Sequence, residues 1–547
     1  MTWYRLTKIF LLTAFFVSTL VLSFGVPRVF NSPDENANWQ FATNFARTWE
    51  LPLAGFDNLD LASLVHPRSV LVAGDQLVPI SFLGLPVMSG LAGGIFGEST
   101  ILLFTPILAV LALIAWRSII WRLFEDSILA DLAAFFLAVH PAFWYYSGRV
   151  MMHNVAFVSL LIFSLWFLIY RPWPKKTKFD WNYLCAGLML GLAVATRASE
   201  LTWISILAVA IWIIYRSAIS YRQLGFLIIG TLVALTPFAV LNQELYGNFL
   251  TTGYTMSDLS GQPLSAVSSV ASTNQFAIVG TRIWHLIFPF GFHELATLRH
   301  VWSYGFVLYP WLSFLAAVGL VIAFFSDKLQ AVTTPHLPVN SRLWRQLAII
   351  TIVLGGYLGL LYGSWNINDN PDPTAVTIAN SYARYWLPLF VLGSVFSALT
   401  VRFAVRRFGY HRWYNLCVGA VLLVIFISSV QIVWGGEDGF INTRLHLREF
   451  DQKRSLIINK TQSDSIIIVD RADKYLWPER QVIVPLRSEQ TYRHLPDLVA
   501  ATPLYYFGIT FPESDLNYFQ STVLEPINLK IINVLTIGEE SLYLIYD

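Results

Sequence analysis

The sequence predicts an all-α polytopic membrane protein followed by a small α/β domain, and three observations support this fold class. Hydrophobic residues make up 55% of the 547 residues and charged residues only 13%, whereas an ordinary soluble domain has about 25% charged residues. Long apolar runs recur along residues 1–434, and short strand-like runs follow in residues 435–547. Aromatic residues reach 15%, including 20 Trp, which is typical of extensive membrane–water interfaces.

Apolar segments long enough to cross a membrane, which takes about 20 residues as a helix, occur about eleven times. In order they are residues 9–26, 99–119, 128–146, 152–170, 183–200, 201–215, 224–242, 304–324, 346–364, 385–401 and 416–434. The first follows Arg5 and Lys8, and no small-residue cleavage site comes after it. We therefore expect an uncleaved helix rather than a signal peptide.

Segment 78–97 is the one ambiguous apolar stretch, because Pro79, Pro86 and several glycines interrupt it. Lys and Arg collect in cytoplasmic connections. If the segment lies in the membrane interface, the cytoplasmic connections hold most of the positive residues. If it crosses, the stretches "WRSIIWR" and "RPWPKKTK" would face outside. We therefore expect a multi-pass protein of the cell membrane in which this segment does not cross and the N-terminus is cytoplasmic.

The same topology places four soluble stretches outside: residues 27–98, 246–303 and 365–384, and the tail, residues 435–547. In the tail, "SIIIVD" and "RQVIVP" predict short buried strands with a helical or turn segment between them. The ending "LKIINVLTIGEESLYLIYD" predicts two strands joined by a turn that contains Gly. We expect residues 1–434 to form a transmembrane domain and residues 435–547 an extracytoplasmic α/β domain. Residues 326–345 form a polar cytoplasmic connector.

An acidic pair, Asp34 and Glu35, stands just after the first apolar segment. Ser32 and Glu35 match a helix capping box, Pro33 fits the first helical position, and both acids face the positive end of the helix dipole. We expect both acids at the surface of this helix. Apolar residues then follow at helical spacing, which predicts an amphipathic helix along the membrane surface. They are Trp39, Ala42, Phe45, Ala46 and Trp49.

Further motifs follow the acidic pair in a fixed order. They are "HPRS" at 66–69, "FGEST" at 96–100, "WRLF" at 121–124, "HPAFWYYSGRVMMHN" at 140–154 and "NSYARYWLPL" at 380–389. As an ordered set they resemble the GT-C glycosyltransferases, in particular the bacterial relatives of protein O-mannosyltransferases and lipid A aminoarabinose transferases. The resemblance covers residues 1–400 and does not extend to the tail.

This resemblance implies an inverting glycosyltransferase that moves a hexosyl or pentosyl unit from a polyprenyl-phosphate donor at the outer membrane face. The acceptor would be a protein, a lipid or a glycan, with membrane lipid as a further partner and no nucleic acid. The resemblance assigns the base that deprotonates or orients the acceptor hydroxyl to Asp34. Glu35 would orient the acceptor or cap the helix.

The departing lipid phosphate needs positive charge on the outer face. Arg68 in "HPRS" and Arg384 in "YARYWLP" are the best candidates. Related enzymes carry His-Pro-Pro or Lys-Pro-Pro at the first position, so the resemblance implies that His66 shares the task, although this chain lacks the second Pro. Tyr382 and Tyr385 flank Arg384 and could line the path of the sugar or the lipid. The alternative for Arg384 is an interfacial anchor, a common role of Arg and Tyr at the ends of spans.

One position departs from the family pattern. Relatives carry an Asp five residues after the Arg that is Arg149 in this chain, and Asn154 stands at that position. Asn can donate and accept hydrogen bonds but cannot act as a base, so Asp34 is expected to carry the proton chemistry alone. Arg149 and Asn154 remain candidates for the substrate cavity. Arg197 and Glu200, three residues apart, predict a structural ion pair.

We expect no cofactor and no catalytic metal, with a divalent metal as the alternative. "FHELATLRH" offers His293, Glu294 and His300 without the HExxH spacing that places two ligands on one helical face. Asp369 and Asp372 lie in "NDNPDP", which is typical of turns.

Two other functions stay open from the sequence. A transporter or flippase of lipid-linked sugars would need ionisable residues within the spans. Most such residues instead lie at span ends or in outer loops, with His140 as the midspan exception. The second alternative is a non-catalytic membrane scaffold that binds partners through the tail.

Overall fold

The structure is a computed structural model that describes residues 2–173, 179–215, 219–256, 287–325, 341–367, 369–370, 372, 374–408 and 412–547. Most of the expected connector 326–345 and about half of the expected outer loop 246–303 lie outside these residues. Contacts divide the chain into two compact units, and each is described by itself. The helical unit comprises Met1–Leu22, Leu103–Phe238 and Leu264–Asn442, and the loop–tail unit comprises Ser23–Leu102, Ala239–Pro263 and Thr443–Asp547.

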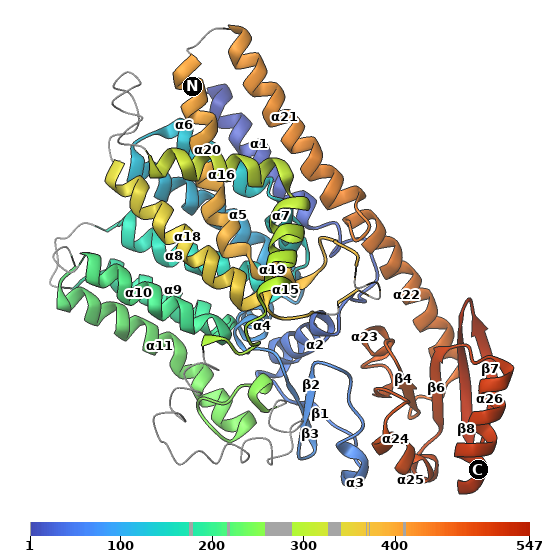
Figure 1. The fold of residues 1–547 in the computed structure, drawn as a ribbon. Helices are drawn as coiled ribbons and strands as arrows, with labels where there is room; N and C mark the ends of the chain where they lie inside the picture. Colours follow the sequence, from blue (N-terminus) through green and yellow to red (C-terminus); the bar gives the residue numbers. More distant parts are fainter. Residues whose placement is uncertain are drawn as a thin grey trace. The chain divides into compact units, whose positions relative to one another are not determined.

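The helical unit is built from apolar helices (Figure 1). They are α1 (Thr2–Thr19), α5 (Ser99–Phe124), α6 (Ser127–Ala138), α7 (Pro141–Gly148), α8 (His153–Ile169), α9 (Trp181–Thr196), α10 (Leu201–Tyr215), α11 (Tyr221–Tyr246), α15 (Glu294–His300), α16 (Pro310–Phe324), α18 (Ser341–Gly363), α19 (Ser381–Tyr385), α20 (Leu387–Phe408) and α21 (Arg412–Gly435). The first four residues of α5 and the last turns of α11 belong to the loop–tail unit. All the segments that the sequence predicts as spans contain helix in the structure.

Five helical runs among the described residues are long and apolar enough to cross a membrane, or up to eight if each bent pair counts as one span. The five are Ser99–Phe124, Tyr221–Tyr246, Ser341–Gly363, Leu387–Arg407 and Leu416–Lys460. The expected spans 183–200 and 201–215 form a single pair, Trp181–Thr196 and Ala198–Ile213, bent by 114°. The expected number of about eleven spans stays a prediction.

Two of the three bends occur where a proline begins the second helix. Pro141 starts α7 after a bend of 57°, and Pro310 starts α16 after a bend of 102°. A proline has no N–H to donate to the preceding turn, but its fixed φ suits the first position of a new helix. The third bend lies at Arg197, whose backbone angles, φ −150° and ψ 83°, are not helical and separate α9 from the following short turn.

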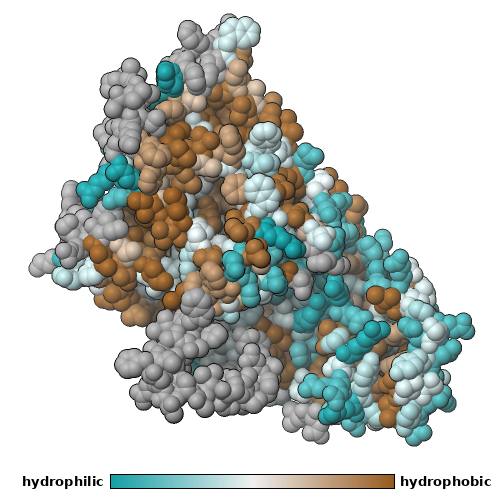
Figure 2. Space-filling model, in the orientation of Figure 1, coloured by the Kyte–Doolittle hydropathy of each residue, from teal (hydrophilic) through white to brown (hydrophobic). Residues whose placement is uncertain are grey.

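Apolar side chains cover much of the outside of the helical unit. On α11, for example, Ile229, Leu232 and Val233 are all more than half exposed. Figure 2 shows hydrophobic surface over α10, α18 and neighbouring helices, and largely hydrophilic surface over the helices and strands of the tail. Extensive apolar surface of this kind is rare on soluble proteins, whereas helices that span a membrane are predominantly apolar.

In the loop–tail unit, α2 (Pro33–Thr48) packs against α4 (Gly84–Phe96) through glycines on α4. A Cβ atom at Gly90 would lie 2.7 Å from the carbonyl oxygen of Ala42, and one at Gly93 would lie 3.1 Å from the Cβ of Ala46. These glycines therefore let the two backbones approach closely. The expected amphipathic helix is present, and its apolar face packs on α4.

Segment 78–97 begins as a strand rather than as a helix. β2 (Val70–Ala73) and β3 (Gln76–Pro79) form a hairpin whose two-residue turn contains Gly74 at φ 66°, and β1 (Leu53–Ala54) pairs with β3. Only 13 residues of α4 follow. At 1.5 Å per residue α4 is about 20 Å long, which is shorter than the roughly 30 Å hydrocarbon core. The helix length agrees with a segment that does not cross, and its place in the interface stays a prediction.

The tail begins with a long helix, α22 (Phe440–Lys460), and continues into a five-stranded sheet of order β5-β4-β6-β8-β7. The strands are β4 (Ile466–Val469), β5 (Gln481–Ile483), β6 (Leu504–Ile509), β7 (Lys530–Ile537) and β8 (Glu540–Tyr546). β4 runs parallel to β5 and β6, while β8 is antiparallel to β6 and β7. The strands predicted from "SIIIVD", "RQVIVP" and the C-terminal residues are confirmed. β6 had no counterpart in the prediction.

Helices surround this sheet, and residues from the predicted first outer loop complete its core. The helices are α23 (Asp473–Leu476), α24 (Glu489–Arg493), α25 (Leu495–Ala501) and α26 (Glu513–Phe519). Leu61 of α3 (Leu59–Ala62) and Val65 are buried in one apolar cluster with Ile466, Leu504 and Tyr543 of the sheet. Leu61 and Val65 are thus part of the core of the tail, although about 400 residues of chain separate them from its strands. The predicted boundary between a transmembrane domain, residues 1–434, and an extracytoplasmic domain, residues 435–547, depends on where the membrane lies. It stays a prediction.

Candidate active site

The predicted site residues fall into two groups. Asp34, Glu35, His66 and Arg68 belong to the loop–tail unit, and a second set belongs to the helical unit. That second set is Arg149, Asn154, Tyr382, Arg384 and Tyr385. Each group is described within its own unit.

Asp34 lies in the first turn of α2. Ser32 caps the helix, and its hydroxyl accepts a hydrogen bond from the backbone N–H of Asp34 at 3.3 Å. Pro33 occupies the first helical position, as expected. The side chain of Asp34 is partly exposed, whereas Glu35 is only 4% exposed. The expectation that both acids lie at the surface is therefore wrong for Glu35, because the helix turns that side chain toward the interior.

The carboxylate of Asp34 is held by the "HPRS" motif. The hydroxyl of Ser69 donates to Oδ1 of Asp34 at 2.5 Å. Ser69 has a φ of 65°, in the left-handed region, which costs a non-glycine residue about 1–2 kcal/mol and persists only when the surrounding structure enforces it. An oriented carboxylate at a helix N-terminus can accept a proton from a hydroxyl group that approaches its exposed side.

Arg68 is paired with a residue of the tail. Its Nε and Nη2 donate to both oxygens of Asp473, with the shortest distance 2.6 Å, and its backbone N–H donates to Oδ2 at 3.0 Å. The side chain of Arg68 is 41% exposed and that of Asp473 is fully buried. This two-pronged geometry is the strong form of an arginine–carboxylate pair. Arg68 thus has a structural partner, and its predicted contact with the donor phosphate is a separate role that stays a prediction. His66 Nδ1 lies 2.9 Å from the carbonyl oxygen of Pro67.

In the helical unit, the structure brings two of the sequence motifs together. Asn154, at the start of α8, donates to the backbone carbonyl of Arg384 in α19 at 3.3 Å. Tyr146, in α7, donates to the carbonyls of Ala379 and Asn380, just before α19, at 2.9 and 3.2 Å. The stretches "HPAFWYYSGRVMMHN" and "NSYARYWLPL" therefore form one local structure. Asn154 acts in it as a hydrogen-bond donor to the backbone.

The guanidinium of Arg384 contacts both polar and aromatic groups. It donates from Nη2 to the hydroxyl of Ser381 at 2.6 Å and from Nη1 to Sδ of Met152 at 2.9 Å. It also lies 5.2 Å from the ring centre of Tyr385, and Arg197 lies 4.7 Å from that same ring. Tyr385 thus holds two cations by cation–π contacts.

Two further candidates are buried within this group. Tyr382 is 2% exposed, and its hydroxyl donates to the carbonyl of Trp365 and accepts from the N–H of Ile367 at 3.3 Å. Arg149 is 5% exposed and donates to the hydroxyl of Tyr145 at 2.9 Å. Tyr382 thus connects α19 to the segment at residues 365–367, whereas Arg149 bonds within the end of α7. Their predicted place in the substrate cavity stays a prediction.

The predicted ion pair between Arg197 and Glu200 is confirmed, with a separation of 2.7 Å. Both side chains are buried, and the hydroxyl of Tyr362 also donates to Glu200. His140, the midspan exception, is packed against the rings of Phe390 and Tyr309, whose centres lie 4.2 and 4.8 Å away.

No group of three or more His, Cys, Asp or Glu side chains that could hold a metal ion occurs in the part of the chain that the structure describes. The carboxylate of Asp372 accepts from both the N–H and the hydroxyl of Thr374, at 2.8 and 2.7 Å, as the turn interpretation predicts. Nδ1 of His300 lies 2.8 Å from the carbonyl oxygen of Gly363.

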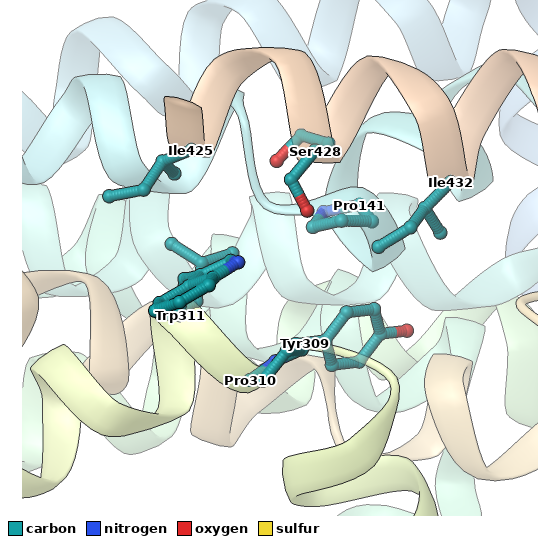
Figure 3. Close-up of a pocket in the computed structure, with 9 residues that line it drawn as sticks. Pro141, Tyr309, Pro310, Trp311, Ile425, Ser428 and Ile432 are labelled. Atoms are coloured by element: carbon teal, nitrogen blue, oxygen red, sulfur yellow. The ribbon is translucent and has the colours of Figure 1, made fainter. Parts of the chain in front are cut away.

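A small pocket in the helical unit lies apart from these candidates (Figure 3). Its lining comes from the start of α7, the start of α16 and the middle of α21. The residues are Pro141, Tyr309, Pro310, Trp311, Leu312, Ile425, Ser428, Ser429 and Ile432. None of the predicted site residues is among them, and the lining is mostly apolar.

Sequence reasoning missed Ser69 and Asp473. Ser69 stands in the "HPRS" motif but had no assigned role, because its contact with Asp34 depends on an unusual backbone angle. Asp473 follows a predicted strand by a few residues, and nothing in the sequence connects it with Arg68, 405 residues away.

Comparison with solved structures identifies the fold. The chain is similar to the crystal structure of ArnT from Cupriavidus metallidurans bound to undecaprenyl phosphate, with a TM-score of 0.57 and 10% identity over 99% of this chain and 98% of that one. For the crystal structure of the same ArnT in the apo state the TM-score is 0.55, with 10% identity over 100% of this chain and 98% of that one. The cryo-EM structure of the arabinofuranosyltransferase AftD from Mycobacteria gives a TM-score of 0.49 at 14% identity, over 99% of this chain and 40% of that one.

These likenesses show a fold, since identity is low. The chain has the GT-C fold, a multi-pass membrane architecture with a small C-terminal sheet domain, as the sequence predicts. No family model matches the sequence, and no curated protein matches it.

Proposed function

We propose that the protein is an inverting glycosyltransferase that takes a sugar from a polyprenyl-phosphate donor at the outer face of the cell membrane. The observation that carries this proposal is the Asp34 carboxylate, fixed at the start of α2 by Ser69 in a chain with the GT-C fold. The ArnT structure with undecaprenyl phosphate supports a lipid-phosphate donor, because this chain aligns with it over nearly its whole length.

Each reacting group has a candidate residue. Asp34 accepts the proton of the acceptor hydroxyl while that oxygen attacks the anomeric carbon of the donor. The bond from the anomeric carbon to the lipid phosphate breaks, and polyprenyl phosphate leaves with its negative charge. Arg384 is the proposed cation for this phosphate, and Arg68 and His66 are further candidates. One displacement at the anomeric carbon inverts its configuration.

A transfer assay on the full chain tests the proposal. The purified protein in lipid nanodiscs would be incubated with radiolabelled polyprenyl-phosphate hexose, pentose and amino-sugar donors, together with a cell-envelope extract as the source of acceptors. The proposal predicts that label from at least one donor moves to the extract and that Asp34→Asn abolishes most of this transfer.

The transporter alternative is tested with the same donors and sealed vesicles. If labelled donor crosses the vesicle membrane while no sugar reaches any acceptor, the glycosyltransferase proposal is wrong. A protein that neither transfers nor transports with any of these donors would favour the scaffold alternative.

A further inference from the structure

The carboxylate of Asp473 in the tail is linked to Asp34 through two side-chain contacts and the peptide bond between Arg68 and Ser69. Asp473 accepts hydrogen bonds from the guanidinium and from the backbone N–H of Arg68. Arg68 is followed directly by Ser69, whose hydroxyl donates to Asp34. All four residues lie within the loop–tail unit.

The backbone on both sides of Ser69 is fixed. The N–H of Arg68 is bonded to Asp473, and the carbonyl of Ser69 accepts from the N–H of Ile80 at 3.3 Å. Val70, the next residue, pairs with Pro79 at the end of the hairpin. A left-handed φ at a serine requires such constraints, and one of them comes from the tail.

Asp473 is itself held by the core of the tail. It begins α23, four residues after β4, whose residues Ile466–Val469 are completely buried between β5 and β6. The side chain of Asp473 is fully buried, so water does not compete for its oxygens. An arginine that meets a rigid, dry carboxylate through two nitrogens has one favoured orientation.

The same segment of the tail also contacts α2 directly. Asn36 donates from Nδ2 to the carbonyl of Trp477 at 2.9 Å, in a buried contact. Nζ of Lys474 donates to the carbonyl oxygen of Asn31 at 3.4 Å. These two contacts occur just before and just after Asp34 in the sequence, and Figure 1 shows α23 beside α2.

We infer that residues 473–477 of the tail position the Asp34 carboxylate, and that Asp473 is a positioning residue that acts through Arg68 and Ser69. This inference rests on the proposed function only for its effect on the rate of sugar transfer. The tail is therefore part of the site that holds the base, although the sequence motifs that carry the family resemblance all lie before it. Arg68 acts mainly as the link in this arrangement.

Steady-state kinetics of the full chain in nanodiscs separate positioning from phosphate binding. We expect Asp473→Asn to lower kcat by about 10- to 100-fold, since small displacements of a reacting group have effects of that size. The KM for the donor should change less than about twofold, because Asp473 touches no donor atom. Asp473→Glu keeps the negative charge but moves it by one methylene group. Its kcat should lie between those of Asp473→Asn and the wild type.

Arg480→Ala is the matched control. Arg480 is 8% exposed and donates to Thr461 and to the carbonyls of Ile458 and Glu479, all within the tail. Its loss should lower the unfolding temperature about as much as Asp473→Asn does, while kcat stays near that of the wild type. If Arg480→Ala loses as much kcat as Asp473→Asn, general damage to the tail explains both and the inference is wrong.

A double-mutant cycle with Arg68→Gln tests the link between the two residues. If Arg68 acts through Asp473, the double variant loses no more kcat than the worse single variant. Additive losses, with a raised donor KM whenever Arg68 is replaced, would assign Arg68 to the phosphate and overturn the inference.

Hydrogen–deuterium exchange provides a readout that does not need catalysis. Asp473→Asn should speed amide exchange in residues 30–41 and 66–82, whereas Arg480→Ala should leave these stretches unchanged. If the wild type transfers no sugar, the proposed function fails, yet this measurement still tests positioning. Unchanged exchange in both stretches of Asp473→Asn would refute the inference whatever the activity.

Discussion

Arg68 and Arg384 have the same predicted role, but the structure gives them different surroundings. Arg68 forms a two-pronged ion pair with a fully buried carboxylate, 405 residues away in the chain. Arg384 donates to Ser381 and Met152 and lies over the ring of Tyr385. Two arginines that stand beside prolines or tyrosines look alike in sequence, and only their partners distinguish a link between segments from a candidate ligand for the donor.

The largest expected effect concerns the base that Arg68 helps to hold. Asp34→Asn should lower kcat by about 10²–10⁴-fold, because the amide cannot accept the proton of the acceptor. Its unfolding temperature should stay close to that of the wild type, since the amide oxygen can still accept from Ser69. Initial rates of sugar transfer and thermal unfolding of the purified variant check both points.

Glu35→Gln is the control for this substitution. Glu35 is buried, so we expect Glu35→Gln to lower the unfolding temperature while much of the activity remains. If Glu35→Gln is inactive and Asp34→Asn is not, the base has been assigned to the wrong acid. If both variants are fully active, the pair only caps the helix.

The next effect sharpens the comparison between the two arginines. Arg384→Gln should raise the KM for the donor by roughly 10- to 100-fold, the equivalent of about 1.5–3 kcal/mol for a hydrogen bond to a charged group. Arg68→Gln should lower kcat and leave the donor KM nearly unchanged. Donor titrations of both variants distinguish the roles, and identical profiles would remove the contrast.

A smaller effect concerns the packing that holds α2 along its length. Gly90→Ala should lower the free energy of unfolding by about 1–3 kcal/mol, the usual range for overpacking, because the new Cβ would meet the carbonyl of Ala42. Gly356→Ala in α18 is the matched control, since nothing lies within 4 Å of its Cβ position. Alanine should there stabilise the helix slightly. Thermal unfolding of the two variants in one detergent gives the comparison, and equal shifts would contradict it.

The smallest effect concerns Arg47 and Glu98, an exposed pair at the other end of α2. Nε of Arg47 lies 2.6 Å from Oε1 of Glu98, and this hydrogen bond holds the pKa of Glu98 below its usual value. The resulting stability is complete above the ordinary pKa of a glutamate and is lost as the pH falls through the lowered value. Glu98→Gln should cost less than about 1 kcal/mol and leave kcat unchanged. A larger loss of stability, or one that high salt does not reduce, would contradict the exposed-pair interpretation.

The sequence predicts local features well and long-range partners poorly. Apolar length and proline positions predict the helices, and the cap at Ser32 follows from a four-residue pattern. The strands of the tail follow from their apolar runs, although β6 was missed even though Pro503 separates "LYYFGI" from the helix before it. The hairpin at 70–79 was hidden by an apolar run that continues into α4.

The candidate site shows the same limit. The acidic pair and both arginines are visible as motifs, but the burial of Glu35 depends on how α2 packs. The partners of Asp34 and Arg68 depend on the backbone angle of Ser69 and on a tail segment that is remote in sequence. Contacts of this kind arise only from the complete fold, and periodicity or spacing does not encode them.

The most direct test of the central claim follows the anomeric carbon of the donor. A polyprenyl-phosphate sugar labelled with ¹³C at that carbon would be incubated with the full chain in nanodiscs and with an envelope extract, and the products observed by NMR. The account predicts a glycosidic product of inverted configuration that appears in step with free polyprenyl phosphate, and almost none with Asp34→Asn. A product of retained configuration would show two displacements and a covalent role for an acid, and donor that crosses the membrane intact would contradict the account altogether.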